Sequence, residues 1–181
     1  MEAQYDLIAS AAEVDAHIQK IARDILTNHA STPLFVALLR GAAPFASKLM
    51  FAIAAEVPDY HPDLDYMMIS TYGDDHNAKQ PIIVTDLAPT TDVKGRAIVI
   101  LDDVIDQGVT SDFVRDLLLK RGALSVELAT LATKAVPGRI SQADYTGFDA
   151  GERWLVGMGL DDATDGHEHY RWMDSIWEIR R

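Results

Sequence analysis

The sequence predicts an α/β protein with a mostly parallel central sheet flanked by helices. Short apolar runs alternate along the chain with longer segments whose apolar residues recur at helical spacing. The run AIVIL, residues 97–101, is apolar throughout, as expected of a strand that is covered on both faces. Strands separated by helices are typical of a parallel sheet, and 181 residues suit one domain with a hydrophobic core.

The first predicted helix begins at SAAE, residues 10–13, which has the pattern of a capping box. Four apolar residues then recur at helical spacing: Val14, Ile18, Ile21 and Ile25. The run LFVALL, residues 34–39, predicts a short buried strand. Arg40 and Gly41 interrupt it, and residues 43–57 are predicted to form a second helix.

Strands and polar turns alternate in the middle of the chain. DLDYMMIS, residues 63–70, predicts a strand, and the polar residues 71–81 predict an exposed loop. The run IIV, residues 82–84, resumes a strand. Residues 88–95 predict a turn that leads into the strand at 97–101.

A third helix is predicted over residues 110–121, with Gly122 as its stop signal. Three consecutive residues are suitable for its start: Thr110, Ser111 and Asp112. Two further strands are predicted at residues 125–133 and 154–161. In parallel sheets, ligands bind beyond the carboxyl ends of the strands, so the loops at these ends are the candidate site.

The composition excludes several kinds of protein. The formal net charge is −12, so the chain is a poor general nucleic-acid binder, because phosphate backbones require a basic surface. It has no cysteine, which excludes disulfides, thiolate metal sites and cysteine catalysis. The N-terminus lacks the pattern of a signal peptide, and no apolar run is long enough to span a bilayer. We therefore expect a cytoplasmic protein with no membrane partner.

The sequence ILDDVIDQGVTSD, residues 100–112, carries the strongest chemical signal. The expected loop, residues 102–109, leads into a helix N-terminus with unpaired N–H groups and a partial positive charge. Gly108 would let the backbone approach a ligand and Thr110 would add a hydroxyl, which together make a phosphate cradle. Asp102 and Asp103 suit sugar hydroxyls, directly or through Mg²⁺. The residues thus indicate a phosphorylated polyol.

Two other interpretations account for part of this pattern. Asp106 and Thr110 are ordinary residues near a helix start and need no ligand there. A receiver-type signalling domain also pairs acids around Mg²⁺. Its acidic pair would follow the first strand, whereas Asp102 and Asp103 lie past the middle of the chain.

Five segments in order resemble those of the purine phosphoribosyltransferases, and of their hypoxanthine-guanine branch in particular. VILDDVIDQGVT resembles the ribose-phosphate-binding signature, and ALLRGAAPFASKLM resembles the pyrophosphate loop with its helix. MISTYGDD is similar to the start of the mobile active-site loop, and LATLATK to the strand that ends in the purine-reading lysine. YTGFDAGERWLVGMGLD is similar to the segment with the base-stacking aromatic residue and a metal-linked aspartate.

The resemblance implies a type I phosphoribosyltransferase fold in a single domain, residues 1–181. The core would lie at 10–150, a small hood at 151–181 with the N-terminal segment, and a mobile loop at 71–81. The implied enzyme belongs to purine salvage. It converts 5-phosphoribosyl-1-pyrophosphate and a 6-oxopurine into a nucleoside 5′-monophosphate and pyrophosphate, with Mg²⁺ as cofactor. Relatives are homodimers or homotetramers, and residues 42–57 are a candidate interface or part of the core.

Matching position also implies the role of each residue. Asp106 would be the catalytic acid/base at the purine N7. The ribose hydroxyls and Mg²⁺ would be contacted by Asp102 and Asp103. The 5′-phosphate would be bound by the loop residues Asp106, Gln107, Gly108, Val109 and Thr110.

The remaining roles concern pyrophosphate, the purine and the lid. Pyrophosphate would be bound by Arg40, Gly41 and Arg171, with a cis peptide in that loop, and Asp161 would help to hold a second Mg²⁺ through water. The purine would be contacted by Lys134, Trp154 and Leu155. Thr71 and Tyr72 would lie on the lid.

Two positions depart from the family pattern. Gln107 stands where a threonine is usual, and its larger amide side chain must turn outward or replace a hydroxyl contact to the phosphate. Arg40 stands where a lysine is frequent, and it keeps the charge but changes the geometry. Gln107 also keeps open a non-catalytic regulator that senses phosphoribosyl pyrophosphate or nucleotides on the same fold.

Overall fold

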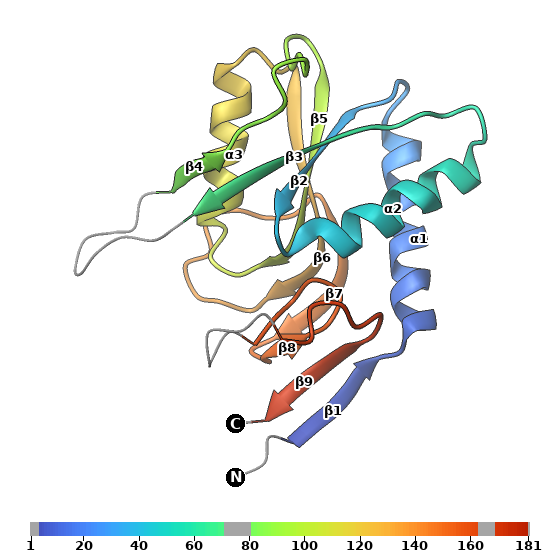
Figure 1. Ribbon diagram of the computed structural model, residues 1–181, viewed down its shortest axis with the longest axis vertical. Helices are drawn as coiled ribbons and strands as arrows, with labels where there is room; N and C mark the ends of the chain where they lie inside the picture. The colour runs from blue at the N-terminus through green and yellow to red at the C-terminus, as the bar shows by residue number, and fades with distance from the viewer. Residues whose placement is uncertain (1–3, 71–80, 163–168, 181) are drawn as a thin grey trace.

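Two sheets organise the part of the chain that the computed structural model describes, residues 4–70, 81–162 and 169–180 (Figure 1). The strands of the larger sheet are β2 (Leu34–Leu39), β3 (Asp63–Ser70), β4 (Ile82–Thr85), β5 (Ala97–Ile105), β6 (Ser125–Lys134) and β7 (Tyr145–Gly151). The strands of the smaller sheet are β1 (Gln4–Ala9), β8 (Leu155–Val156) and β9 (Ile176–Arg180). The helices are α1 (Ala11–Asn28), α2 (Ala42–Glu56) and α3 (Val109–Lys120).

The larger sheet has the strand order β4-β3-β2-β5-β6-β7. Strand β4 is antiparallel to β3, and the neighbouring pairs from β3 to β7 are all parallel. The predicted mostly parallel sheet is therefore confirmed. The smaller sheet joins the two ends of the chain in the order β1-β9-β8 and forms the predicted hood.

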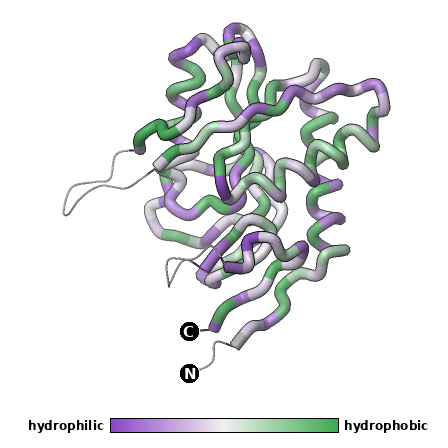
Figure 2. The backbone as a smooth tube through the Cα atoms, viewed as in Figure 1, coloured by the Kyte–Doolittle hydropathy of each residue, from purple (hydrophilic) through white to green (hydrophobic). Residues whose placement is uncertain are grey.

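The capping box at the start of α1 is present as predicted. The backbone N–H of Glu13 donates to Oγ of Ser10 at 3.4 Å, and the N–H of Ser10 donates to Oε2 of Glu13 at 2.9 Å. The predicted apolar stripe is the buried face of the helix. In Figure 2 the tube of α1 accordingly alternates between hydrophobic and hydrophilic colours along its turns.

Alternate residues of the central strands face two separate hydrophobic cores. Phe35 and Val99 lie in the core that α1 and α2 cover, whereas Val36 and Ile100 lie in the core that includes Val114 of α3. Successive side chains of a strand point to opposite faces, so helices cover the sheet on both sides. This confirms the interpretation of residues 97–101 as a strand that is buried on both faces.

The strand at 97–101 is longer than predicted, and this corrects the expected loop at 102–109. Asp102 pairs with Thr130, and Ile105 pairs with Thr133, in the parallel ladder with β6. The backbone therefore stays extended through both carboxylates. The helix begins at Val109, directly after Gly108. The φ of Gly108 is 83°, in the left-handed region that favours glycine.

The predicted strand at 154–161 is only partly correct. Leu155–Val156 forms β8, but Gly157 and Gly159 have φ values of 97° and 102° and turn the chain. Strands β1, β7 and β9 were not predicted as strands. No helix of the described residues is long and apolar enough to cross a membrane.

Candidate active site

A cavity of 240 Å³ opens at the carboxyl ends of β2, β3 and β5. Among the described residues, nine line it: Leu38, Leu39, Gly41, Ile69, Asp102, Asp103, Val104, Thr110 and Arg171. Four different stretches of the sequence that the phosphoribosyltransferase resemblance singled out thus meet in one place: the pyrophosphate loop, the end of β3, the acidic pair with the start of α3, and Arg171. The carboxyl edge of a parallel sheet is where such folds bind ligands.

The paired carboxylates of Asp102 and Asp103 are the electrostatic centre of this cavity. The backbone N–H of Asp103 donates to Oδ1 of Asp102 at 3.1 Å, and the N–H of Val104 donates to Oδ1 of Asp103 at 3.0 Å. Burial raises the pKa of Asp102 well above its usual value, and the charge of Asp103 raises it further. The pair therefore gains from a cation or from hydroxyl donors in the cavity.

Asp103 is better supported as an anion than its neighbour. Burial raises its pKa as well, but four influences oppose the rise: a hydrogen bond with the Asp102 side chain, the N–H of Val104, the positive charge of Arg171 and the N–H of Asp103 itself. Arg171 and Asp103 therefore lie close enough to influence each other across the cavity that they line.

The loop between β2 and α2 brings backbone, rather than side chains, to the cavity. The peptide bond between Leu39 and Arg40 is cis, within the loop where the resemblance implies a cis peptide. The side chain of Arg40 is exposed. Gly41 lies against the carboxylate of Asp103, because a Cβ atom at position 41 would stand 2.7 Å from Oδ1 of Asp103 and closer still to Oδ2.

The predicted phosphate loop lies at the N-terminus of α3, beside residues that the sequence did not single out. Asp106 and Gln107 are exposed, and Gly108 is buried. The carbonyl of Gln107 accepts a hydrogen bond from the N–H of Ile140 at 2.9 Å. A Cβ atom on Gly108 would stand 2.7 Å from Cβ of Ser141, so glycine is needed there for packing as well as for its positive φ.

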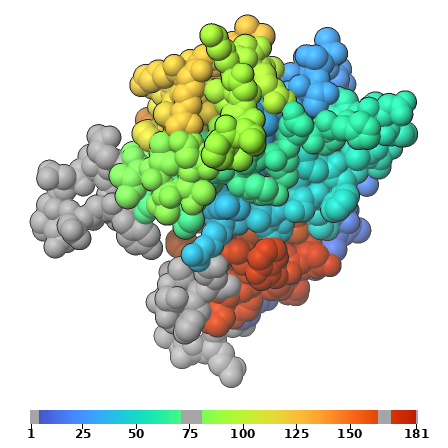
Figure 3. Space-filling view, turned by 45° about the horizontal axis from the view of Figure 1, so that its top comes forward, coloured from blue at the N-terminus to red at the C-terminus, as the bar shows by residue number. Residues whose placement is uncertain are grey.

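Arg171 is buried, with 7% of its surface exposed, and is held from two sides. Its Nη2 atom lies 2.8 Å from Oδ2 of Asp161, and its Nη1 atom donates to the carbonyl of Gly159. Gly159 in turn lies against the loop between β2 and α2, since a Cβ atom there would stand 2.8 Å from the carbonyl carbon of Gly41. In the space-filling view the red C-terminal segment accordingly lies beside the cyan start of α2 (Figure 3).

The three predicted purine contacts lie at the end of β6 and the start of β8. The Nζ atom of Lys134 stands 4.7 Å from the centroid of the Trp154 ring, a cation–π distance. Trp154 is 42% exposed, whereas Leu155 is buried. The lysine therefore lies over one face of a partly exposed ring, whereas the side chain of Leu155 packs in the core.

The predicted lid residues Thr71 and Tyr72 lie outside the described residues, so the structure says nothing about them. The glycines inside the predicted strand at 154–161 indicate a close approach of another group, and Gly159 does lie against Gly41. Ser141 is the structural neighbour of the site that the sequence analysis missed. Ser141 carries no comparable signal.

The acidic pair meets the requirements of a magnesium site. Within the described residues no group of three or more His, Cys, Asp or Glu side chains is placed to hold a metal. Mg²⁺ needs no such group, because it takes one or two protein carboxylates and completes its shell with water and phosphate oxygens. Asp102 and Asp103 could hold it in this way. The carboxylate of Asp161 pairs with Arg171.

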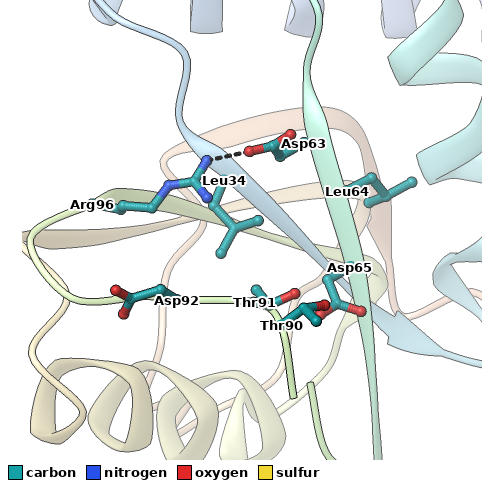
Figure 4. A pocket seen from close by; sticks show the side chains of 8 residues that line it. All are labelled: Leu34, Asp63, Leu64, Asp65, Thr90, Thr91, Asp92 and Arg96. Atoms are coloured by element: carbon teal, nitrogen blue, oxygen red, sulfur yellow. Dashed lines mark hydrogen bonds and ion pairs between the residues drawn. The ribbon is translucent and has the colours of Figure 1, made fainter. Parts of the chain in front are cut away.

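A second cavity, of 380 Å³, lies at the amino ends of the same strands (Figure 4). Several of its polar groups already have partners. Arg96 pairs with Asp63 at 2.7 Å, and Oδ2 of Asp65 accepts from the N–H of Ala88 at 2.9 Å. Since Arg96 and Asp63 are paired with each other and the carboxyl edge is the usual ligand edge, the cavity at the acidic pair is the better candidate for chemistry.

Comparison with known proteins agrees with the geometry. A family model described as a phosphoribosyl transferase domain matches residues 4–163. The chain is 33% identical over 168 residues to the bifunctional protein TilS/HprT of Listeria monocytogenes; this covers 91% of the chain but 24% of that relative, so the chain spans about a quarter of its length. It is 34% identical over 158 residues to the hypoxanthine-guanine phosphoribosyltransferase of Streptococcus pneumoniae, covering 86% of the chain and 84% of the relative.

A solved structure is similar over nearly the whole length. The hypoxanthine phosphoribosyltransferase of Staphylococcus aureus superposes with a TM-score of 0.82 at 25% sequence identity, covering 97% of this chain and 91% of that one. The similarity therefore extends over the sheet, the three helices and the hood.

Proposed function

The chain belongs to the phosphoribosyl transferase family, and we propose that it transfers the 5-phosphoribosyl group from 5-phosphoribosyl-1-pyrophosphate to a 6-oxopurine. The acceptor would be hypoxanthine, guanine or both, with xanthine as a third candidate. The products would be the nucleoside 5′-monophosphate, IMP or GMP, and pyrophosphate. Such an enzyme serves purine salvage.

One observation carries this proposal: the acidic pair, the backbone of Gly41 and the guanidinium of Arg171 line a single cavity at the carboxyl edge of the sheet. This is the donor set that phosphoribosyl pyrophosphate requires. Its ribose hydroxyls can donate to the carboxylates of Asp102 and Asp103. Its pyrophosphate needs cationic and N–H donors, which Arg171, Arg40 and the backbone at Gly41 would supply. The N-terminus of α3 would take the 5′-phosphate through Gly108, Val109 and Thr110.

The proposed reaction replaces one bond at C1′ of the ribose. N9 of the purine bonds to C1′ as the bond from C1′ to the pyrophosphate oxygen breaks, and Asp106 accepts the proton that N7 loses. The sugar is oxocarbenium-like in between, as in glycoside cleavage. Most of the acceleration would come from holding both reactants in line and from donors aimed at the departing pyrophosphate.

Mg²⁺ is part of this proposal. Asp102 and Asp103 would hold it together with substrate oxygens, and Asp161 would contribute to a second ion through water. The ion would neutralise charge on the pyrophosphate as it leaves. Buried carboxylates with raised pKa values support this assignment, because a nearby cation offsets the cost of their burial.

Recognition of the base is assigned to the purine contacts named above. Lys134 would donate to the 6-oxo group, the exposed face of Trp154 would stack on the ring, and the backbone of Leu155 would contact its edge. The 6-oxo group is common to hypoxanthine, guanine and xanthine, so Lys134 would separate these three from adenine. Discrimination among them would depend on groups around C2.

Three further properties belong to the same proposal. The chain would act as one domain, in the cytoplasm, as a homodimer or homotetramer. The apolar face of α2 packs into the core through Phe45, Ala46, Leu49 and Ile53, so it is not free to form an interface. Phe51, which is 77% exposed on the outer face of α2, is the residue of this helix best placed to meet a partner subunit.

Turnover is the direct test of the function. The protein is mixed with phosphoribosyl pyrophosphate and Mg²⁺ and, in separate reactions, with hypoxanthine, guanine, xanthine or adenine, and nucleotide is measured. We expect a monophosphate with at least one 6-oxopurine and little with adenine, and omission of Mg²⁺ as control should abolish it. Absence of nucleotide with every 6-oxopurine would refute the enzyme, and binding of phosphoribosyl pyrophosphate without turnover would instead identify the non-catalytic regulator.

A further inference from the structure

Tyr170, the residue before Arg171, has a backbone conformation that is unusual for its type. Its φ is 70°, in the left-handed region that costs a residue with a Cβ atom about 1–2 kcal/mol. Its carbonyl accepts a hydrogen bond from the N–H of Met173 at 3.0 Å, which closes a turn around Arg171. Strained backbone of this kind persists only where surrounding contacts hold it.

A residue of the opposite end of the chain supplies such a contact. The hydroxyl of Tyr5, in β1, lies 2.6 Å from the hydroxyl of Tyr170, and the ring centroids are 5.3 Å apart with planes tilted by 53°. The hydrogen bond with Tyr170 raises the pKa of the Tyr5 hydroxyl. Strand β1 is fixed in turn by antiparallel pairing with β9, which places it in the hood (Figure 1).

The segment that Tyr5 contacts leads directly into the cavity. Gly159 and Arg171 exchange backbone and side-chain bonds: the N–H of Gly159 donates to the carbonyl of Arg171 at 2.9 Å, and the Arg171 guanidinium donates back to the Gly159 carbonyl. Gly159 lies against Gly41, and Gly41 lies against Asp103. A continuous series of packed groups therefore runs from the N-terminal strand to the acidic pair.

We propose that Tyr5 is a positioning residue: through Tyr170 it sets the orientation of Arg171 and so the affinity of the site for pyrophosphate and for phosphoribosyl pyrophosphate. The proposal rests on the assignment of Arg171 to the pyrophosphate site. Tyr5 itself touches no substrate. It holds the turn that aims the guanidinium, and its effect should fall on ligands that carry a pyrophosphate group and not on the purine.

The test removes single hydroxyls. Tyr5→Phe, Tyr170→Phe and the double variant are compared with wild type for the KM values of phosphoribosyl pyrophosphate and hypoxanthine, and for the dissociation constant of magnesium pyrophosphate by calorimetry. Loss of one hydrogen bond predicts about a three- to tenfold rise in KM for phosphoribosyl pyrophosphate and in the dissociation constant. The KM of hypoxanthine should stay constant, and the double variant should resemble the single ones, because both remove the same bond.

Tyr145→Phe is the matched control. The hydroxyl of Tyr145 donates a hydrogen bond to Oε2 of Glu127 at 2.7 Å, so this substitution also removes one hydrogen bond of a phenol. Tyr145 is the first residue of β7 and lies at the amino end of the sheet, away from the cavity. The substitution should change thermal stability without changing either KM. If Tyr5→Phe raises both KM values equally, or leaves pyrophosphate affinity as in Tyr145→Phe, the positioning role is wrong. If the wild-type protein binds pyrophosphate but forms no nucleotide, the proposed function is refuted, and calorimetry with the variants still decides the role of Tyr5. If the wild-type protein does not bind pyrophosphate, both the proposed function and the positioning role of Tyr5 are refuted.

Discussion

The backbone of Gly41 packs directly on the carboxylate of Asp103, so that a Cβ atom at position 41 would come within 2.7 Å of Oδ1 and closer still to Oδ2. This contact joins the loop after β2 to the acidic end of β5. Gly41 contributes no side chain to this junction, so the backbone groups of the loop lie beside the carboxylate and would be available to a ligand that also meets it. The proposed pyrophosphate and ribose sites are neighbours for this reason.

Gly41→Ala tests this contact. The φ of Gly41 is −57°, which alanine adopts without strain, so the substitution acts only through its methyl group. That methyl group would displace the Asp103 carboxylate or the loop. We expect kcat/KM for phosphoribosyl pyrophosphate to fall by about 100-fold, the order of loss that a shift of 1 Å causes at a reacting centre.

Gly95→Ala is the control for this substitution. Nothing lies within 4 Å of a Cβ atom at position 95, but its φ of 71° makes alanine strained there. It should lower the stability by about 1 kcal/mol and leave the kinetic constants unchanged, since it precedes β5 at the amino end of the sheet. Normal kinetics in Gly41→Ala would show that the contact with Asp103 has no role in substrate binding.

Asp102→Asn should stabilise the ligand-free protein at neutral pH. An unfolded aspartate has a pKa of about 3.9, and in the fold the pKa of Asp102 is raised by burial and by Asp103. Between these two pKa values the folded state binds more protons than the unfolded state, so stability falls as the pH rises through that window. Removing the charge should raise the melting temperature by about 2–4 °C for each kcal/mol gained in the free energy of unfolding. The affinity for phosphoribosyl pyrophosphate should fall, because the variant loses a carboxylate of the proposed ribose site.

The pH dependence separates this effect from general repacking. Near pH 3, about one unit below the usual aspartate pKa of about 3.9, Asp102 is largely protonated in both states and most of the gain should disappear. Asp86→Asn is a control that should change the stability at neutral pH in the opposite direction, by lowering it. The Arg121 side chain holds the pKa of Asp86 below its usual value, so this residue stabilises the fold at neutral pH and the contribution is lost as the pH falls through that lowered pKa. An equal melting-temperature gain for Asp102→Asn at both pH values would contradict the electrostatic explanation.

Local patterns were sufficient to predict much of the fold. Helix α1 carries its own signals, a capping box and an apolar stripe, and both are present. The apolar run 97–101 predicts a strand buried on both faces because each of its side chains must leave water, and Val99 and Ile100 do enter different cores. The motif around Asp102 likewise located the cavity, since a carboxylate pair behind such a strand lies at the ligand edge of the sheet.

What the sequence could not predict depends on partners distant along the chain. Extension of β5 through Asp102 is imposed by pairing with Thr130 in β6, which outweighs the low strand propensity of aspartate. Strand β1 exists because β9 pairs with it, more than 160 residues away. The contacts of Gly159 with Gly41 and of Tyr5 with Tyr170 have the same origin. No window of local sequence contains both members of such a pair.

Lys134→Ala should weaken purine binding selectively. If the ammonium donates to the 6-oxo group, its loss removes a hydrogen bond to a charged group and raises the KM of hypoxanthine by about 10- to 100-fold, with the KM of phosphoribosyl pyrophosphate unchanged. Initial-rate kinetics at varied hypoxanthine measure this. Lys94→Ala, an exposed lysine in the turn before β5, is the control and should alter neither value. An unchanged KM for hypoxanthine in Lys134→Ala would remove this lysine from base recognition.

Asp106→Asn should affect the maximal rate far more than substrate binding. Asp106 is exposed beyond the end of β5, between the acidic pair and the N-terminus of α3. The proposed function makes its carboxylate the acceptor of the purine N7 proton. Asparagine keeps the shape and can still hydrogen-bond, but it cannot accept the proton from N7. General-base contributions of about 10²–10⁴ predict the size of the fall in kcat.

The comparison of kcat with binding decides the role of Asp106. An interaction made only in the transition state lowers kcat and kcat/KM together and leaves the dissociation constant of phosphoribosyl pyrophosphate nearly unchanged. Asp116→Asn removes an exposed carboxylate from the same region of the chain, one that pairs with Lys120 at 3.8 Å on the outer surface of α3, and it should have no kinetic effect. If Asp106→Asn instead weakens phosphoribosyl pyrophosphate binding as much as it lowers kcat, Asp106 binds the substrate and the proton acceptor is another group.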